Sequence, residues 1–266
     1  MLGRNHATMG LLVAEGIALT THLPLHGMIP MVVGVGAGSL WPDIDEHESK
    51  ISFSLVPIST MVSAVMSRIT GGHRRATHSP IGIGISTGLA LLAAKYNPHI
   101  SMLLCIAAVY ILLRSVIPTL VRWLFVGGSL GILVVSIFAG LALFHSHDTT
   151  TLVWWFGLGS LVHLVGDVVT AGGIPVMWPF STTKVALTHM KVGSPTERII
   201  GLLMTATLLV SVYVTLHGVS IKAPSTTALV TQAHNMLAHH GNAVISNLMY
   251  RLHLVSTSLL HQIKKY

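Results

Sequence analysis

The feature that most constrains this chain is a series of long apolar blocks that contain few or no charged residues. The clearest block, residues 123–144, has no Asp, Glu, Lys or Arg. A helix needs about 20 such residues to cross a bilayer. Charged residues make up only 9% of the chain, whereas an ordinary soluble domain carries about 25%. The sequence therefore excludes a soluble enzyme, a disordered protein and a secreted disulfide scaffold, and it predicts an integral membrane protein.

Six further blocks bring the expected number of membrane crossings to about seven. They are residues 9–23, 27–41, 80–94, 100–113, 152–170 and 199–217. The first two are short for a full crossing, so a tilted or partly inserted hairpin is an alternative for them. Residues 53–66 are amphipathic and fit an interfacial helix. We therefore predict an all-α fold, a polytopic membrane bundle that contacts the lipid bilayer.

The chain divides by composition into two parts, with no boundary typical of a soluble domain. Residues 1–217 form the predicted membrane-embedded domain. Residues 218–266 form a tail whose apolar residues recur at helix-like intervals, among them Leu229, Met236 and Leu248. This spacing predicts a C-terminal amphipathic helix that lies on the membrane or on the bundle.

The distribution of Lys and Arg predicts the orientation. Most basic residues outside the tail lie in loops on the side of the N-terminus, whereas the opposite short loops carry only Lys95. The positive-inside rule then places the N-terminus in the cytoplasm. The formal net charge of +7 is explained by such loops contacting anionic lipid. Because the basic residues are scattered and not interleaved with aromatic ones, no nucleic-acid partner is expected.

Five polar clusters interrupt the apolar background. They lie at residues 4–6, 42–45, 73–80, 163–167 and 172–180. Each falls before an odd-numbered predicted span or after an even-numbered one. All five therefore lie on the same face of the membrane, whichever way the protein inserts. A shared face is what one assembled site requires.

The strongest metal-binding signal is His163 with Asp167. Residues four apart stack on one face of a helix, about one turn from each other. An imidazole and a carboxylate in that arrangement can bind one divalent cation. The alternative is that Asp167 pairs locally and His163 is a satisfied buried histidine. Ionisable residues inside an apolar span are costly and mark function by default.

Further candidate ligands come from the other clusters. Asp43 and Asp45 follow Trp41-Pro42, where the proline is expected to end the helix; a solvated acidic turn is their alternative. His73 and His78 are five apart, which suits a loop better than a helix, with Ser79 as N-cap and Pro80 at the first helical position. Two more residues lie nearer the N-terminus. His6 is either a ligand or a loose surface residue, and Glu15 needs a partner, for which the metal cluster or a bundle histidine is expected.

Arg74 and Arg75 lie between the two histidines of the third cluster. Guanidinium groups bind phosphate and other oxyanions through paired hydrogen bonds. The alternative is ordinary anchoring of a cytoplasmic loop by basic residues. We treat both arginines as candidate catalytic residues that stabilise a developing oxyanion.

Taken in order, these motifs resemble a known family. Arg-Asn-His at residues 4–6, Pro-Asp-Ile-Asp at 42–45, His-Arg-Arg-Ala-Thr-His-Ser at 73–79, His-Leu-Val-Gly-Asp at 163–167 and Pro-x-x-Trp-Pro-Phe at 175–180 look like the YdjM-type family. The resemblance covers about residues 4–198. It implies a bacterial inner-membrane, LexA-regulated, metal-dependent hydrolase, induced in the SOS response. By that likeness the metal positions are His6, Asp43, Asp45, His73, His78, His163 and Asp167.

The sequence thus favours a hydrolase whose site opens at the cytoplasmic face. The mixed nitrogen and oxygen ligands suit one or two divalent ions, zinc rather than magnesium. Asp45 or Asp43 is the expected general base, and a phosphoester such as a lipid headgroup is the expected substrate. The alternative is a transporter of a metal ion or small anion that uses the same residues. Transport sites usually lie near the bilayer midplane, whereas these clusters lie at span ends.

Overall fold

The computed structural model describes residues 1–216, except residues 47–48, 50–51, 53–55, 118–120 and 122–126. The chain divides into two units, Met1–Val219 and Ser220–Tyr266. The predicted amphipathic tail and its histidines lie outside the described residues. So do residues 122–126, where the longest predicted span begins.

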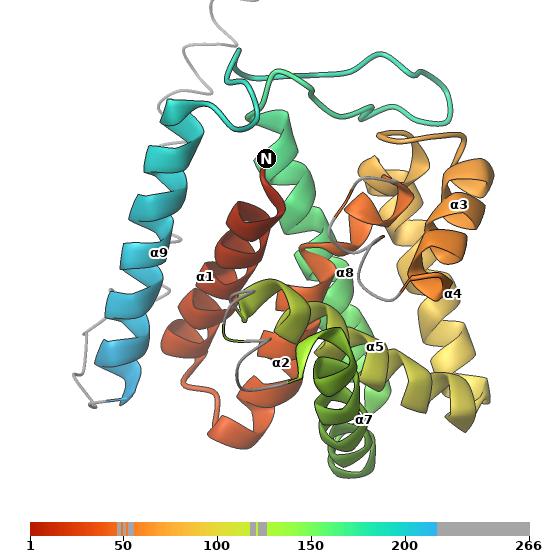
Figure 1. Ribbon diagram of the computed structural model, residues 1–266, viewed down its shortest axis with the longest axis vertical. Coiled ribbons are helices and arrows are strands. Elements are labelled where there is room, and N and C mark those ends of the chain that lie inside the picture. Colours follow the sequence, from red (N-terminus) through yellow and green to blue (C-terminus); the bar gives the residue numbers. More distant parts are fainter. Residues whose placement is uncertain (47–48, 50–51, 53–55, 118–120, 122–126, 217–266) are drawn as a thin grey trace, which may run out of the picture. The chain divides into compact units, whose positions relative to one another are not determined.

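The described part of the chain is all helical, as predicted (Figure 1). Most of the helices coincide with the predicted apolar blocks, and α3 overlaps the predicted amphipathic segment at residues 53–66. The α-helices are α1 (Gly3–Thr21), α2 (Leu25–Gly38), α3 (Ile58–Thr70), α4 (Pro80–Tyr96), α5 (Pro98–Val116), α7 (Gly128–Ser146), α8 (Thr149–Val168) and α9 (Pro195–Leu216). Two short 3₁₀ helices are η1 (Trp41–Asp45) and η2 (Ala76–His78).

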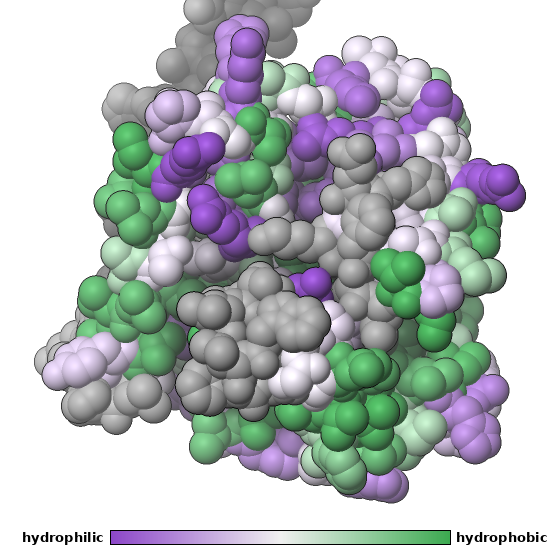
Figure 2. Space-filling model, viewed as in Figure 1, coloured by the Kyte–Doolittle hydropathy of each residue, from purple (hydrophilic) through white to green (hydrophobic). Residues whose placement is uncertain are grey.

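Four of these helices are long and apolar enough to cross a membrane: α5, α7, α8 and α9. Two more, α2 and α4, are apolar but shorter. Figure 2 shows hydrophobic side chains over the flanks of the molecule and hydrophilic ones gathered near the N-terminal end of α1. These features confirm a multi-pass membrane protein, and the number of about seven crossings stays a prediction.

Side-chain caps set where several helices begin. The Ser79 hydroxyl accepts a hydrogen bond from the Gly82 amide, and Pro80 occupies the first position of α4, as the sequence predicted. Asp148 caps α8 by accepting from the Thr150 amide. One predicted boundary is wrong. Helix α2 ends at Gly38, and Pro42 lies inside η1, because Ser39 closes the helix with hydrogen bonds to Val35 and Gly36.

Glycines bring α2 and α8 into very close contact. Gly34 and Gly38 are four apart on one face of α2, where they pack against the backbone of Leu152 and Phe156 on α8. On α8, Gly159 faces the carbonyl of Val35. Such small residues let membrane helices approach backbone to backbone. The C-terminal end of α2 is therefore fixed against the middle of α8.

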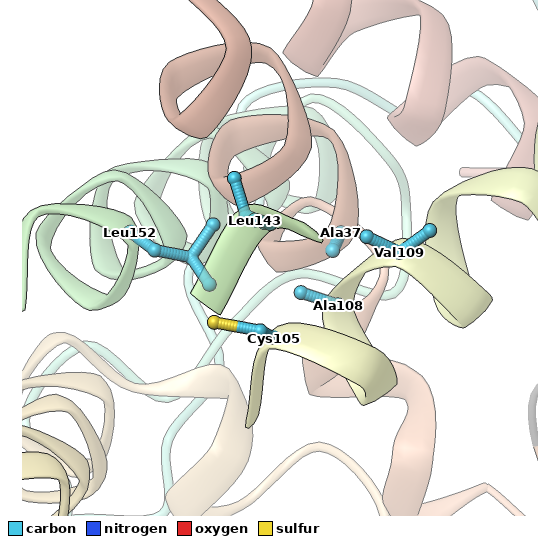
Figure 3. Packing of buried hydrophobic residues seen from close by; sticks show 6 residues of the cluster. All are labelled: Ala37, Cys105, Ala108, Val109, Leu143 and Leu152. Atoms are coloured by element: carbon cyan, nitrogen blue, oxygen red, sulfur yellow. The ribbon is translucent and has the colours of Figure 1, made fainter. Parts of the chain in front are cut away.

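A buried hydrophobic cluster joins four helices below this contact (Figure 3). It consists of Ala37 from α2, Cys105, Ala108 and Val109 from α5, Leu143 from α7 and Leu152 from α8. The cluster holds α5 and α7 to the α2–α8 pair. The helix η1 contacts the α2–α8 pair, whereas η2 contacts α4 and η1.

Helix α9 lies beside α1 (Figure 1). Glu15 on α1 is buried, and its carboxylate accepts a hydrogen bond from the Thr215 hydroxyl on α9. The expected partner of Glu15, a metal cluster or bundle histidine, is therefore wrong. The carboxylate finds its partner on the neighbouring helix, because it lies far along α1 from the polar end.

Candidate metal centre

Residues of four polar clusters meet at one end of the bundle, and a shared membrane face for all five stays a prediction. The first turn of α1, the helix η1, the segment from His73 through η2 and the C-terminal part of α8 supply the side chains. Six of the seven predicted ligands fall into three overlapping groups whose candidate ligand atoms lie within 4.8 Å of one another. The groups are His6–Asp43–His163, Asp43–His73–His78 and His78–His163–Asp167.

Four side chains form the centre of this arrangement. Asp43 Oδ1 lies 3.5 Å from His78 Nε2 and 3.7 Å from His163 Nε2. Asp167 Oδ2 lies 3.6 Å and 3.7 Å from the same two nitrogens. A tetrahedral zinc ion with bonds of about 2.0–2.1 Å spaces its ligand atoms about 3.3–3.4 Å apart. Within the group of His78, His163 and Asp167 the printed distances are close to this spacing, so one such ion fits there after a small contraction, whereas Asp43 belongs to the two other groups.

The two central imidazoles are held by their other ring nitrogen. His163 Nδ1 lies 2.8 Å from the carbonyl oxygen of Ser39 and so donates to it. His78 Nδ1 is 3.0 Å from the Thr77 hydroxyl. Both side chains are fully buried, yet neither Nε2 has a hydrogen-bond partner among the described residues. Metal-binding histidines are held in this way, with the second nitrogen free for the ion.

His6 extends the centre on the side of α1. Its ring stacks on that of His163, with centroids 3.7 Å apart, and its Nε2 lies 3.3 Å from Asp167 Oδ1. The Met1 amino group contacts the same oxygen. His6 is buried, and neither ring nitrogen has a hydrogen-bond partner within the described part of the chain. The alternative of a loose surface histidine is therefore wrong.

Asp45 lies behind the ligands and outside the three groups. It is fully buried, and its Oδ1 accepts from His73 Nδ1 at 2.8 Å. Its Oδ2 accepts from the Thr77 hydroxyl. His73 Nε2 lies 3.2 Å from Glu46. Asp45 therefore orients His73 directly and His78 through Thr77, whereas Asp43 is only half-buried and lines the adjoining cavity.

Burial and neighbouring groups set the charge states of Asp43 and His78. Burial opposes ionisation of Asp43, but the imidazoles of His163 and His78 outweigh it and hold the pKa of Asp43 below its usual range. Burial also lowers the pKa of His78. Ionised carboxylates and neutral imidazoles are the forms that bind metal ions.

The two neighbouring arginines differ in position. Arg74 has a positive φ of 58°, which turns its side chain into the site. Its Nη2 lies 3.0 Å from Asp167 Oδ2, and its Nη1 donates to the Gly173 carbonyl. Arg75 is exposed, and among the described residues the cavity is lined by Arg74 and not by Arg75. The geometry therefore brings one of the two predicted arginines to the ligands.

Sequence reasoning missed Glu197, which holds the first turn of α1. Its buried carboxylate accepts from the Leu2 amide, from Asn5 Nδ2 at 3.1 Å and from the Gly193 amide. The Glu197 amide in turn donates to Ser194 Oγ at 3.3 Å. Ser-Pro-Thr-Glu at residues 194–197 has the spacing of a capping box, and this signal marks the start of α9. It does not reveal that the carboxylate reaches α1.

Comparison with known proteins gives one match. No curated protein and no solved structure matches the chain. The model of a family described as YdjM inner membrane protein matches residues 1–232, further than the motifs alone reach. The match and the apolar helices support an inner-membrane location. The chain belongs to the YdjM inner membrane protein family.

Proposed function

We propose that the protein is a metal-dependent hydrolase of phosphoesters with one or two divalent ions, zinc by preference. The observation that carries this proposal is the central group of His78, His163, Asp43 and Asp167. Two buried imidazole nitrogens without a partner face two carboxylates at 3.5–3.7 Å. Leaving such groups buried and unpaired costs about 1–3 kcal/mol each, and a bound cation removes that cost.

The neighbouring residues supply the remaining parts of the reaction. A metal held by these residues would lower the pKa of a water molecule to roughly 7 and polarise the phosphoryl group. Hydrolysis would form a bond from the water oxygen to phosphorus and break the bond to the leaving oxygen, which would take a proton from solvent. Asp43, the half-buried carboxylate at the cavity, accepts the proton of the water. Arg74 stabilises the charge that develops on the phosphoryl oxygens, and Asp45 positions His73 and His78.

A second ion is held in this proposal by the outer histidines. His6 with Asp43 and His163 forms one candidate group, and Asp43 with His73 and His78 forms another. Asp43 belongs to both groups and would bind an ion through one carboxylate oxygen, which leaves the other oxygen to accept the proton of the water. The site lies at the helix ends, and the positive-inside rule places this end in the cytoplasm.

Elemental analysis followed by a hydrolysis panel tests the proposal. Purified protein should carry about one or two zinc ions per chain, because each complete site needs three or four protein ligands. His78→Ala and His163→Ala should lose most of the metal and the chelator-sensitive turnover of phosphomonoesters and phosphodiesters. His99→Ala is the matched control, since His99 is exposed at the opposite end of the bundle. Metal content that is unchanged in both site variants would refute the assignment.

The transporter alternative uses the same ligands and is separated by the same preparation. It requires metal-dependent ion flux into vesicles and no turnover of any ester. Flux that depends on His163, combined with an inactive hydrolysis panel, would replace the hydrolase by a transporter.

A further inference from the structure

A cavity of about 490 Å³ opens directly beside the metal centre. Asp43 and His73 form part of its wall. Three arginines from separate elements also line it: Arg4 on α1, Arg74 before η2 and Arg114 in the last turn of α5. A substrate that reaches the centre through this cavity must pass these side chains.

Three arginines outnumber the two carboxylates, Asp43 and Glu46, in the lining of this cavity, and this balance favours an anionic ligand. Arg4, Arg74 and Arg114 are permanent cations, and a divalent metal at the centre adds further positive charge. Arginine presents paired N–H donors that match phosphate oxygens. The sequence does not predict that Arg4 and Arg114 line one cavity, because nothing in the chain order brings α1 and α5 together.

A second, apolar cavity of about 110 Å³ lies among α4, α5 and α8. Trp41, Leu104 and Phe156 are among its lining residues. Ile111 lines both this cavity and the arginine cavity. Trp41 lines the apolar cavity, and it lies two residues before the candidate metal ligand Asp43 in the short helix η1.

The apolar cavity has a size that suits a hydrocarbon segment. Cavities of about 150 Å³ with apolar walls stay dry and bind small hydrocarbons. The few hydroxyl groups in this wall include that of Ser86, which is already bonded to the Ile83 carbonyl. Among the walls are α5 and α8, two of the candidate membrane-spanning helices. Two walls of the cavity are therefore helices that could lie in the bilayer.

We propose that the substrate is a membrane lipid with a phosphate head. The phosphate lies in the arginine cavity against Arg74 and Arg114, next to the metal centre. The first carbons of the lipid chain pass Ile111 and lie beside Trp41 in the apolar cavity. This inference rests on the proposed hydrolase for its reaction, but binding of the lipid does not require turnover.

Short alkyl phosphates test the two cavities without an activity assay. Binding of inorganic phosphate, methyl phosphate, butyl phosphate and hexyl phosphate is measured on zinc-loaded protein in lipid nanodiscs. Each methylene group that leaves water should raise the affinity about fourfold until the apolar cavity is filled. A hexyl phosphate that binds no tighter than inorganic phosphate would overturn the proposal.

Substitutions assign the two parts of the ligand. Arg114→Gln should weaken all four phosphates about tenfold or more, the usual effect of losing a charged hydrogen bond. Arg68→Gln, at an exposed arginine of α3, is the matched control.

Ala107→Phe should fill the apolar cavity and abolish the chain-length effect while inorganic phosphate still binds. Ala142→Phe, at an exposed alanine of α7, is its control. Equal effects in a test variant and its control would refute that part of the site.

Trp41 reports the position of the chain. Bound 6-bromohexyl phosphate should quench tryptophan fluorescence, because bromine quenches at short range, and Trp41→Phe should remove most of that quenching. Trp178→Phe should retain it, since Trp178 lies in the loop after α8. Phosphatidic acid in the nanodisc should compete with the probe. Chain-dependent binding without such competition would assign the site to a soluble alkyl phosphate and overturn the lipid assignment.

The two proposals fail in different ways. If these ligands bind as described but no phosphoester is turned over, the hydrolase fails and the lipid site remains. If soluble phosphoesters are hydrolysed without any effect of chain length or of Arg114→Gln, the hydrolase remains and the lipid site is refuted.

Discussion

Replacing Gly38 with alanine should weaken both the fold and the metal centre. A Cβ atom at Gly38 would lie 2.0 Å from the Phe156 carbonyl oxygen, whereas ordinary contact begins at 3.4 Å. Helices α2 and α8 must therefore move apart locally by about 1.4 Å, because the three obstructing atoms, O, C and Cα of Phe156, belong to the helical backbone. Overpacking of this kind costs about 1–3 kcal/mol. For a chain of this size that corresponds to a melting temperature lower by roughly 2–12 °C.

The same displacement reaches the metal centre through Ser39. This residue follows Gly38, and its carbonyl accepts from His163 Nδ1 at 2.8 Å. A shift of about 1 Å breaks that hydrogen bond, and losing such a support of a ligand weakens metal binding about 10–100-fold. The affinity for zinc should be measured by competition with a chromophoric chelator, and stability by circular dichroism in detergent.

Gly88→Ala is the matched control for this substitution. Gly88 also lies in an apolar helix, α4, but a Cβ there would meet nothing within 4 Å. The control should leave zinc affinity unchanged and stabilise the helix by up to about 1 kcal/mol. If Gly38→Ala melts and binds zinc like Gly88→Ala, the α2–α8 contact does not position His163, and the reasoning is wrong.

Three further predictions follow from separate contacts. Asp45→Asn should lower metal affinity and turnover roughly 10–100-fold, because Asp45 orients His73 and Thr77; unchanged metal affinity would refute that role. Single cysteines at Thr182 and Ser146 in a Cys105→Ala background should label from opposite sides, with Ser146→Cys reactive to an impermeant periplasmic reagent and Thr182→Cys shielded. Hydrogen bonds from Thr150 hold the pKa of Asp148 below its usual range. The cap that Asp148 forms therefore stabilises α8 above about pH 4, and this stabilisation is lost as the pH falls. Asp148→Ala should destabilise the protein at neutral pH, and the difference in stability from the unsubstituted protein should shrink in acid.

Much of the centre was predictable because membrane topology restricts where polar residues can meet. Apolar blocks of sufficient length reveal helices, and the parity of those helices places His6, Asp43, His78 and Asp167 at one end. Spacing alone paired His163 with Asp167, since residues four apart share a helix face. These inferences need no knowledge of packing, and the structure brings all five side chains together.

The roles of the two η1 carboxylates were not predictable from their order. Asp43 and Asp45 are two residues apart in the same short helix, and either could have been the ligand. Their difference arises from the 3₁₀ turn, which directs Asp43 to His78 and His163 and Asp45 to His73 and Thr77. The contact between Gly38 and Phe156 was equally hidden, because a glycine in an apolar run does not show which helix it faces.

The role of Glu197 leads to a last prediction. Helix α9 is the least embedded of the candidate spans, with 6% of its apolar window buried. Its first turn nevertheless carries a fully buried carboxylate that accepts from Leu2, Asn5 and Gly193. Because these bonds hold the first turn of α1, they also set the position of His6, which stacks on His163. Glu197 is therefore a positioning residue for the outer part of the metal centre.

Glu197→Gln should separate this positioning role from a merely structural one. The new amide group would present a donor to one of the amides that Glu197 now accepts from, at a cost of about 1–3 kcal/mol. If the role is positioning, zinc bound through His6 should be lost while the ion at His78 and His163 stays bound. Arg198→Gln, at the exposed neighbouring residue, should retain both. Lower stability with unchanged zinc stoichiometry and affinity would show that Glu197 only holds α9 to the bundle, because His6 would then keep its place without the carboxylate.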